Sequence, residues 1–445
     1  MGIRSTVGAA TMLVLVVFTT VITTATETAR SFHASIAWQT WALGGMSLGL
    51  AGALLTAGAL ADAFGRRRVF VISSVALAVS TALGAASPSM LVFVAARILQ
   101  GAAGAGVVAS GLGLIGHAFP PGPSRAHATG IWGAMLAGGI AIGPILGAGL
   151  AAAFGWRSAY GLEALGAAVL AGAGHKLLPE SRGKARPRRI DPPGALTMLI
   201  AMACLTAGLT SGRSGWTSPT TVILLAAGLA ALAAFAWIEV VRPDPMLDLG
   251  LLRRPLFLVS IGGAAVTGLA TVALMSYAPT LIEQGLHRSA PAAGGILAVW
   301  SVTSMLVAMQ AHRLPARVDA RGRLIAGLLL SASGSAALTG LAIQSSWWRL
   351  VPGLLLAGIG SGPANAALAR LAVESVPRAS MALGGGANNT ARYLGSALGI
   401  ALLVAVVASG GAGQAGLIHG WNRAALLAAL LNVAGAILAA ACRER

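Results

Sequence analysis

Hydrophobic residues fall in long blocks along this chain, and short polar connections separate the blocks. Most blocks have the roughly 20 residues that an α-helix needs to cross the hydrocarbon layer of a bilayer. We therefore predict an all-α membrane protein with fourteen transmembrane helices. They lie at about residues 6–27, 36–60, 69–87, 89–117, 127–153, 156–178, 193–211, 219–241, 255–283, 291–311, 323–344, 348–373, 380–408 and 419–441.

The composition excludes an ordinary soluble enzyme. Of the 445 residues, 56% are hydrophobic and 9% are charged, whereas roughly 25% are charged in a typical soluble domain. The mean hydropathy is +0.82. So many apolar residues cannot all belong to a core, because a soluble fold must also cover itself with polar surface.

The net charge of +18 gives the expected orientation. The basic residues are 28 Arg and two Lys. With a cytoplasmic N-terminus, 22 of them fall on the cytoplasmic side, six on the outer side, and Arg97 and Arg392 inside blocks. This asymmetry is the usual topology signal of membrane proteins rather than a nucleic-acid patch. We expect a multi-pass protein of the cytoplasmic membrane with both termini in the cytoplasm.

Two connections divide the chain into six, two and six helices. One is the basic stretch 179–193, and the other is the Pro- and Asp-containing stretch 242–254. The predicted parts are an N-terminal six-helix half (1–178), a cytoplasmic linker (179–192), two additional helices with a loop (193–254) and a C-terminal six-helix half (255–445). Related halves are expected of a secondary transporter, in which the substrate site lies between them near the middle of the membrane.

The connection after block 36–60 carries the most specific motif, formed by Gly58, Asp62, Gly65, Arg66 and Arg67. A carboxylate at a helix C-terminus is disfavoured by the helix dipole, so Asp62 is expected to have a cationic or helix N-terminal partner. Gly65 permits the tight turn that brings the arginines near.

The spacing of this motif recurs later in the chain. Asp319, Gly322 and Arg323 repeat it, and we expect them at the cytoplasmic end of the second helix of their half. In this loop the chain resembles the major facilitator superfamily. Its six-two-six plan is similar to that family's fourteen-helix drug:proton antiporter branch, and the resemblance covers essentially the whole chain. It implies alternating access, with Asp62 and Arg66 holding the cytoplasmic side closed.

Two further segments fit this resemblance. Arg97 lies inside a block, where an Arg is costly unless it is paired or hydrated. It matches the family's helix-4 Arg motif, and satisfaction by backbone carbonyls is the alternative. Gly139, Gly143 and Gly147 stack on one helix face, which allows close approach of another helix. With Pro144 they resemble the Gly-Pro motif of antiporters, although Ala148 stands where a second Gly is common; a simple packing groove is the alternative.

Several polar residues are candidates for a substrate cavity. Thr19, Thr23 and Thr26 share one helix face and suggest a hydroxylated wall, unless they bond back to their own helix carbonyls. The other candidates place polar groups in or beside blocks that could have been wholly apolar; they are Trp300, Asn365, Asn388, Asn389 and Arg392.

The proton-coupling site is expected in an unusual place. Relatives in the resembling branch carry an Asp and an Asn on the first helix, where this chain has Phe18 and Thr23. Glu163 lies about 10 Å below the outer surface if its helix begins at Trp156. At that depth a carboxyl either pairs or keeps its proton. We predict that Glu163, modulated by Arg97, exchanges the proton, with Glu27 as the next candidate; a permanently protonated structural Glu163 is the alternative.

These observations predict a secondary active exporter. The chain has no phosphate-binding loop of the ATPase type, so a gradient must drive transport. The expected activity is proton antiport of lipophilic drugs or natural-product-like small molecules; the alternative is a dedicated exporter or uniporter of one endogenous metabolite without proton coupling. The expected partners are the small lipophilic substrate, the proton and the lipid bilayer, for a monomer. We expect no enzyme activity, cofactor, metal or nucleic acid, because the seven His are scattered and no nucleophile clusters with a base.

Overall fold

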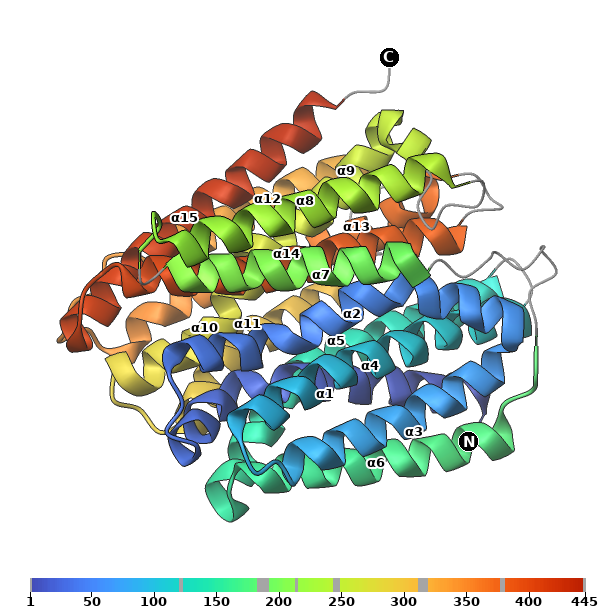
Figure 1. Ribbon diagram of the computed structural model, residues 1–445, viewed down its shortest axis with the longest axis horizontal. Coiled ribbons are helices and arrows are strands. Elements are labelled where there is room, and N and C mark those ends of the chain that lie inside the picture. Colours follow the sequence, from blue (N-terminus) through green and yellow to red (C-terminus); the bar gives the residue numbers. More distant parts are fainter. Residues whose placement is uncertain are drawn as a thin grey trace. The chain divides into compact units, whose positions relative to one another are not determined.

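The chain is helical in nearly all of the residues that the structure, a computed structural model, describes (Figure 1). These residues are 2–119, 123–181, 192–212, 215–242, 249–310, 319–376 and 381–442. Each of the fourteen predicted blocks coincides with a helical run. The first six are α1 (Ile3–Ser31), α2 (Ile36–Phe64), α3 (Arg66–Ala85), α4 (Met90–Ala118), α5 (Pro123–Phe154) and α6 (Trp156–Leu177).

The second part of the chain contains eight further helical runs. The ninth run is continuous but includes two π-helical segments; its pieces are α9 (Pro255–Val266), η3 (Thr267–Val272), α10 (Ala273–Thr280) and η4 (Leu281–Gly285). The other runs are α7 (Pro192–Ser211), α8 (Pro219–Val241), α11 (Ala290–Met309), α12 (Ala320–Ala337), α13 (Val351–Glu374), α14 (Met381–Ala408) and α15 (Gly413–Ala441). Two short 3₁₀ turns precede α9 and α13, at Leu249–Arg253 and Trp347–Leu350.

The helix boundaries differ most from the prediction near α12. The block predicted at 323–344 begins earlier and ends at Ala337, because Gly340 adopts a φ of +72°, which does not continue a right-handed helix. The expected position of Asp319 at the end of a second helix is wrong. Asp319 is the N-cap of α12, and its Oδ1 accepts a hydrogen bond from the Gly322 N–H at 2.7 Å. A short acidic side chain is stabilised there by the unpaired N–H groups and the dipole.

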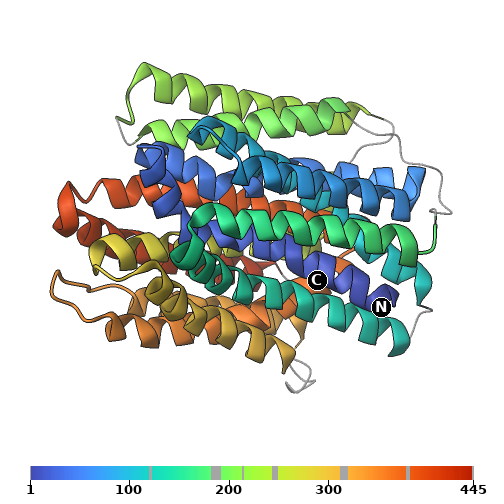
Figure 2. The ribbon, with the colours of Figure 1, turned by 90° about the horizontal axis from the view of Figure 1, so that it is seen from below.

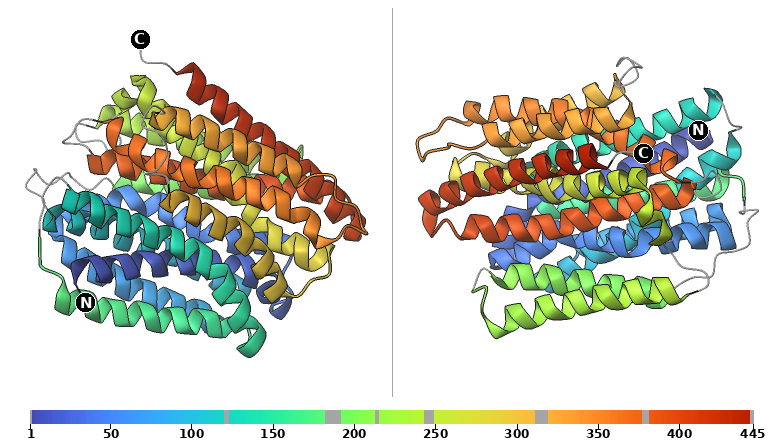
Figure 3. Two further views of the ribbon diagram at one scale, coloured as in Figure 1. Left: turned by 180° about the vertical axis from the view of Figure 1, so that it is seen from behind. Right: turned by 90° about the horizontal axis from the view of Figure 1, so that it is seen from above.

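The helices form two compact units. Unit 1 comprises residues 1–199 with 235–246, and unit 2 comprises 200–234 with 247–445. In unit 1, α1 packs on α5, α2 on α4, and α3 on both α4 and α6. In unit 2, α12 lies between α13 and α15, and α14 packs along α9 and η3 (Figure 3). The domain boundaries expected from the linkers stay a prediction, and residues 182–191 of the basic connection lie outside the described residues.

Helices α7 and α8 run side by side as a pair (Figure 2). Gly208 of α7 lies against Leu225 of α8, and Gly228 of α8 lies against Leu205 of α7. This reciprocal fit of a small residue against a Leu brings the two helices close together. Their role as two additional helices inserted between the halves stays a prediction.

The outward faces of the helices are apolar, as expected for contact with lipid. Within the described part of the chain, eleven helices are long and apolar enough to cross a membrane. Helix α6, which carries Arg157, Glu163 and Lys176, is not among them. Even so, Leu162, Leu165 and Val169 are 49%, 62% and 63% exposed on one side of α6, while Glu163 is buried on the other. Helix α6 therefore has the two faces expected of a helix between lipid and a protein interior.

The predicted orientation can be tested by cysteine labelling. Ser87 in the short α3–α4 connection is 1% exposed, so its exposed neighbour Ala86 is the better labelling site. In a variant without Cys204 and Cys442, a cysteine at Ala86 should react with an impermeant maleimide in intact cells. A cysteine at the exposed Gln310, which follows α11, should react only after the cells are opened. Reaction of Gln310→Cys in intact cells, at the same rate as Ala86→Cys, would overturn the orientation.

Candidate functional site

Helix α6 is held at its start by Glu27 of α1. Gly155 has a φ of +81° and turns the chain into α6. The Trp156 N–H then donates to Glu27 Oε1 at 3.3 Å. A carboxylate at a helix N-terminus is favoured by the free N–H groups and by the dipole. Glu27, the second candidate for proton exchange, therefore has a structural contact at the N-terminal end of α6.

Two turns further along α6, Glu163 faces α1. Its side chain is 2% exposed, and Oε1 accepts a hydrogen bond of 2.5 Å from the Thr20 hydroxyl. Its other oxygen, Oε2, has no hydrogen-bond partner among the described residues. Near it, the hydroxyls of Thr24 and Tyr160 are 3.0 Å apart. Glu163 is thus a buried carboxyl with one polar partner and one free oxygen.

Arg97 of α4 is fully buried and binds mainly backbone carbonyls. Its Nη1 donates to the Val17 carbonyl at 2.8 Å and to Gln100 Oε1 at 2.7 Å. Its Nη2 donates to the Phe18 carbonyl at 3.2 Å, and Nε donates to the Ala42 carbonyl at 3.4 Å. Arg97 therefore ties α4 to α1 and α2. No guanidinium nitrogen of Arg97 lies within 4.0 Å of a Glu163 carboxyl oxygen, so the two side chains form no ion pair. Any effect of Arg97 on that carboxyl therefore acts at longer range.

The threonine face of α1 and the glycine face of α5 form one interface. The Thr19 hydroxyl donates to the Leu15 carbonyl at 2.7 Å and also lies 3.3 Å from the Gly139 carbonyl. Thr23 donates to the Pro144 carbonyl at 2.9 Å. A methyl group added to Gly143 would collide with Thr19.

The threonines make the back-bonds that were the alternative to a cavity wall, and they also bond to α5. Thr19 and Thr23 are 2% and 1% exposed, Thr26 is also buried, and Gly147 lies against Thr20 and Thr23. In this structure Thr19 and Thr23 therefore line a helix contact rather than an open wall.

The loop between α2 and α3 is organised around Glu180, which follows α6. Gly65 has a φ of +111°, and a Cβ at this position would come within 2.7 Å of Glu180 Oε1. The same oxygen accepts the Arg67 N–H at 3.1 Å, at the start of α3. The side chain of Arg66 reaches the Gly113 carbonyl of α4 at 3.1 Å. The side chain of Asp62 lies outside the described residues, and a Cβ at Gly58 would meet open space.

Sequence reasoning missed the role of Glu180. Its only signal is an acid placed directly after a hydrophobic block and before a basic run. Its partners at the start of α3 are 113 residues away in the chain, and a pairing over that separation has no local sequence signature.

The cavity candidates of unit 2 are distributed over three helices. Trp300 of α11 donates its ring N–H to the Ser361 hydroxyl of α13 at 3.2 Å. Asn388 of α14 donates to the backbone and the hydroxyl of Ser260 in α9, at 2.9 and 3.0 Å. Both side chains are buried.

The other candidates of unit 2 are half-buried. Asn365 of α13 makes no hydrogen bond to another described residue. Asn389 and Arg392 contact each other on α14. Asn365, Asn389 and Arg392 are therefore the members of the candidate set that stay partly exposed.

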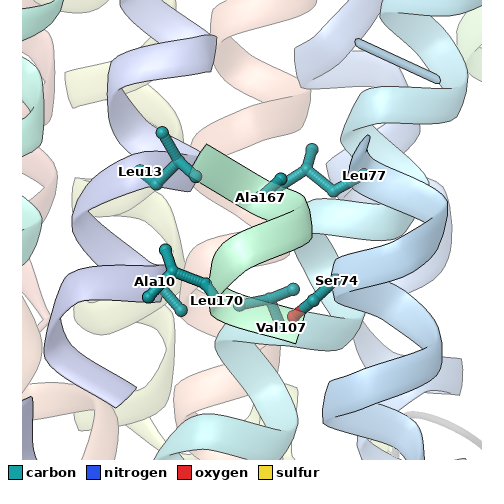
Figure 4. Close-up of a pocket in the computed structure, with 7 residues that line it drawn as sticks. All are labelled: Ala10, Leu13, Ser74, Leu77, Val107, Ala167 and Leu170. Carbon is teal, nitrogen blue, oxygen red and sulfur yellow. The ribbon is translucent and has the colours of Figure 1, made fainter. Parts of the chain in front are cut away.

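A small void in unit 1 is too narrow to hold a water molecule. Figure 4 shows its seven lining residues, of which only Ser74 brings an oxygen. That hydroxyl donates to the Phe70 carbonyl at 2.8 Å. This void is therefore a packing defect among α1, α3, α4 and α6 and has no chemistry for a ligand. Across the described ranges, no three His, Cys, Asp or Glu side chains come together as metal ligands.

The fold and the buried polar groups inside its spans are those of a multi-pass membrane transporter. Residues 7–400 match the Major Facilitator Superfamily, and the chain belongs to that superfamily. It is 31% identical over 394 residues to the tetracenomycin C resistance and export protein of Streptomyces glaucescens, covering 85% of this chain and 71% of that protein. It is 32% identical over 426 residues to the puromycin resistance protein of Streptomyces alboniger, covering 90% and 82% of the two chains.

A solved structure shows the same fold. A bacterial homologue of the human lysosomal transporter Spinster superposes with a TM-score of 0.68 at 15% identity, covering 99% of this chain and 96% of that one. At this identity the likeness shows the fold alone. The multi-pass membrane transporter that the sequence predicted is confirmed.

The α1–α5 interface gives a stability prediction. Gly143→Ala should lower the free energy of unfolding by about 1–3 kcal/mol, because the new methyl group collides with Thr19 and the α1 backbone. Gly149→Ala is the matched control on the same helix, where nothing lies within 4 Å of the added Cβ. The control should be neutral or slightly stabilising, since Ala favours helix over Gly by roughly 1 kcal/mol. Melting temperatures of the purified proteins in detergent measure both; equal values for the two variants would contradict the interface.

Proposed function

We propose that this protein is a proton-coupled exporter of lipophilic, drug-like or natural-product-like small molecules that works by alternating access. The observation that carries the proposal is Glu163, a buried carboxyl on the inner face of α6, with one hydrogen-bond partner and one oxygen that bonds to none of the described residues. Ionisable residues at such depth are costly, so a transporter retains them for ion or proton movement.

The relatives support the export of drug-like compounds. The similar proteins from Streptomyces carry names that refer to resistance and export. A multidrug resistance protein of Mycobacterium tuberculosis is also 30% identical over 383 residues. The alignments with these three proteins cover 85%, 90% and 85% of this chain.

Thr20 offers a way for the proton to affect helix packing. Its hydroxyl lies 2.5 Å from Glu163 Oε1 and 3.4 Å from the Gly143 carbonyl of α5. A hydroxyl has one proton to donate. An ionised Glu163 accepts the hydrogen bond of the Thr20 hydroxyl. A protonated Glu163 can instead donate a hydrogen bond to the Thr20 oxygen, which leaves the Thr20 hydroxyl to donate to the Gly143 carbonyl. Protonation would therefore tighten the α1–α5 contact beside Pro144.

The charges around Glu163 come from few elements. Arg97 on α4 is the buried cation of unit 1, and Tyr160 is the other titratable group on the inner face of α6. The middle of α1 contributes hydroxyls, with Glu27 near its outer end. The facing stretches of α3 and α5 contain no titratable residue in their membrane parts. The proposed proton exchange therefore depends on Glu163, with Arg97 contributing positive charge and no direct bond.

The α2–α3 loop would act at the other end of the helices. We propose that Asp62 and Arg66 stabilise the cytoplasmic ends of the helices when the transporter is open to the outside. The contacts of Arg66 with α4 and of Glu180 with the start of α3 support a fixed loop.

The proton proposal is tested by Glu163→Gln. Glutamine keeps the size of the side chain and an oxygen that can accept from Thr20, but it cannot exchange a proton. In proteoliposomes, uphill transport driven by an imposed pH gradient should fall at least about tenfold, while exchange without a gradient continues. The probe is the dye that cells with the gene export best from a panel of chemically unrelated dyes.

Glu374→Gln is the matched control. Glu374 ends α13 and pairs on the surface with Arg370 at 2.6 Å, so its loss should leave uphill transport intact. A Glu163→Gln protein that accumulates the dye against its gradient as well as the parent would show that Glu163 is structural. Export of one compound alone from the panel, without any response to a pH gradient, would favour a dedicated metabolite exporter.

A further inference from the structure

The two arginines that the sequence places deep inside spans differ in how many partners they have. Arg97 is fully buried, and all three of its side-chain nitrogens donate to carbonyl oxygens, at 2.7 to 3.4 Å. Arg392 is half-buried and makes one hydrogen bond, from Nη2 to Asn389 Oδ1 at 2.6 Å. Its Nε and Nη1 bond to none of the described residues. Every side-chain nitrogen of Arg97 therefore has an acceptor in the protein, whereas two side-chain nitrogens of Arg392 have none among the described residues.

The position of Arg392 is fixed by close packing. On α14, Gly395 and Gly399 lie against the backbone of Ala265 and Leu269. Gly268, in the π-helical segment η3, lies against the backbone of Arg392 itself. Such π-helical segments occur frequently at functional sites. The guanidinium is therefore presented from a rigid helix, which preorganises it for a ligand.

Two neighbours orient the guanidinium without neutralising it. Asn389 donates its amide N–H to the Gly385 carbonyl at 3.1 Å, which turns its oxygen toward Arg392. The Tyr393 ring lies 5.4 Å from the guanidinium carbon, within range of a cation–π contact. Neither group is a carboxylate.

No described acid in unit 2 is placed to neutralise Arg392. The acidic residues described there are Glu283, Asp319 and Glu374, and each lies within three residues of a helix end. None of them forms an ion pair with Arg392. Gly384 is the first residue of the candidate span in α14, and Arg392 lies about 12 Å further along the helix axis. An unpaired cation inside a span is expensive and is retained when a ligand uses it.

We propose that Arg392 binds the anionic group of the transported compound, so that the protein favours lipophilic substrates carrying a carboxylate or a similar anion. The inference rests on the proposed export function and adds its substrate class. A guanidinium with free donors matches a carboxylate through parallel N–H···O bonds. The apolar walls of the span would take the rest of the molecule.

The test compares two probes that share one ring and chain and differ in the end group. 1-Pyrenebutyrate is an anion at neutral pH, and 1-pyrenebutanol has the same ring and chain with a neutral end. Their dissociation constants are measured by fluorescence titration of the full chain in phosphatidylcholine nanodiscs. The parent should bind the butyrate more tightly than the butanol. Arg392→Gln should reduce this preference about tenfold. Arg392→Lys keeps the positive charge but loses the planar pair of N–H donors, so its preference should lie between those of the parent and Arg392→Gln.

Arg370→Gln is the matched control, because it removes a positive charge from unit 2 at an exposed surface pair; the preference should then equal that of the parent. If the parent protein binds both probes equally, the proposal is wrong. This outcome needs no variant, so the test does not depend on whether Arg392→Gln folds. The Arg392→Gln protein could keep the parent's preference for the butyrate and retain less phosphatidylglycerol than the parent. That result would show that Arg392 binds a lipid, and it would also overturn the proposal.

Export is measured separately, as loss of Nile red from cells with and without the gene. A parent that exports Nile red but shows no preference for the butyrate overturns the anion inference alone. A parent that exports neither Nile red nor 1-pyrenebutyrate but keeps the Arg392-dependent preference supports the anion site and overturns the proposed export.

Discussion

The need to satisfy polar groups inside the membrane governs unit 1, and Arg97 is the clearest case. With no water in the hydrocarbon layer, a guanidinium must find acceptors within the protein. Arg97 finds them on the backbones of α1 and α2 and on Gln100 of its own helix. These bonds fix α1 relative to α4. The placement of Thr20 opposite Glu163 depends on that fixed position of α1.

Glycine makes the polar contacts of α1 with α5 possible. A hydroxyl on one helix reaches a carbonyl on the next only when the backbones approach closely. Gly139, Gly143 and Gly147 provide that approach along one face of α5. Pro144 has no N–H, so the Ile140 carbonyl loses its regular helix partner. In a separate contact, the Thr23 hydroxyl donates to the Pro144 carbonyl. The result is a helix contact held by hydroxyl–carbonyl bonds, which a proton on Glu163 can reach through Thr20.

Much of the fold was predictable because it is encoded locally. Each hydrophobic block became a helical run, since spacing and length alone mark a helix that must face lipid. The glycine face of α5 was also visible from its four-residue spacing. What covers that face was not visible, because the threonines of α1 read equally well as a cavity wall. The docking of Glu180 beside Gly65 and the satisfaction of Arg97 by carbonyls depend on which distant helices meet. Asp319 misled the sequence argument, since repeated spacing does not reveal whether an acid ends one helix or caps the next.

The two units carry their intramembrane charges differently, and this bears on coupling. In unit 1 the acids Glu163 and Glu239 are both buried, and the buried cation Arg97 donates to protein oxygens from all three side-chain nitrogens. In unit 2 the described acids stay at helix ends, and the cation keeps free donors. If the proton uses Glu163 and an anionic substrate uses Arg392, the two ligands share no side chain, so neither can displace the other by direct competition. Coupling would then have to pass through a helix rearrangement between two states, with each ligand binding one state more tightly than the other. A ligand shifts an equilibrium only by its difference in affinity for the two states. The α1–α5 contact, where one hydroxyl proton is shared between Glu163 and Gly143, is an element of unit 1 on which protonation can act in this way.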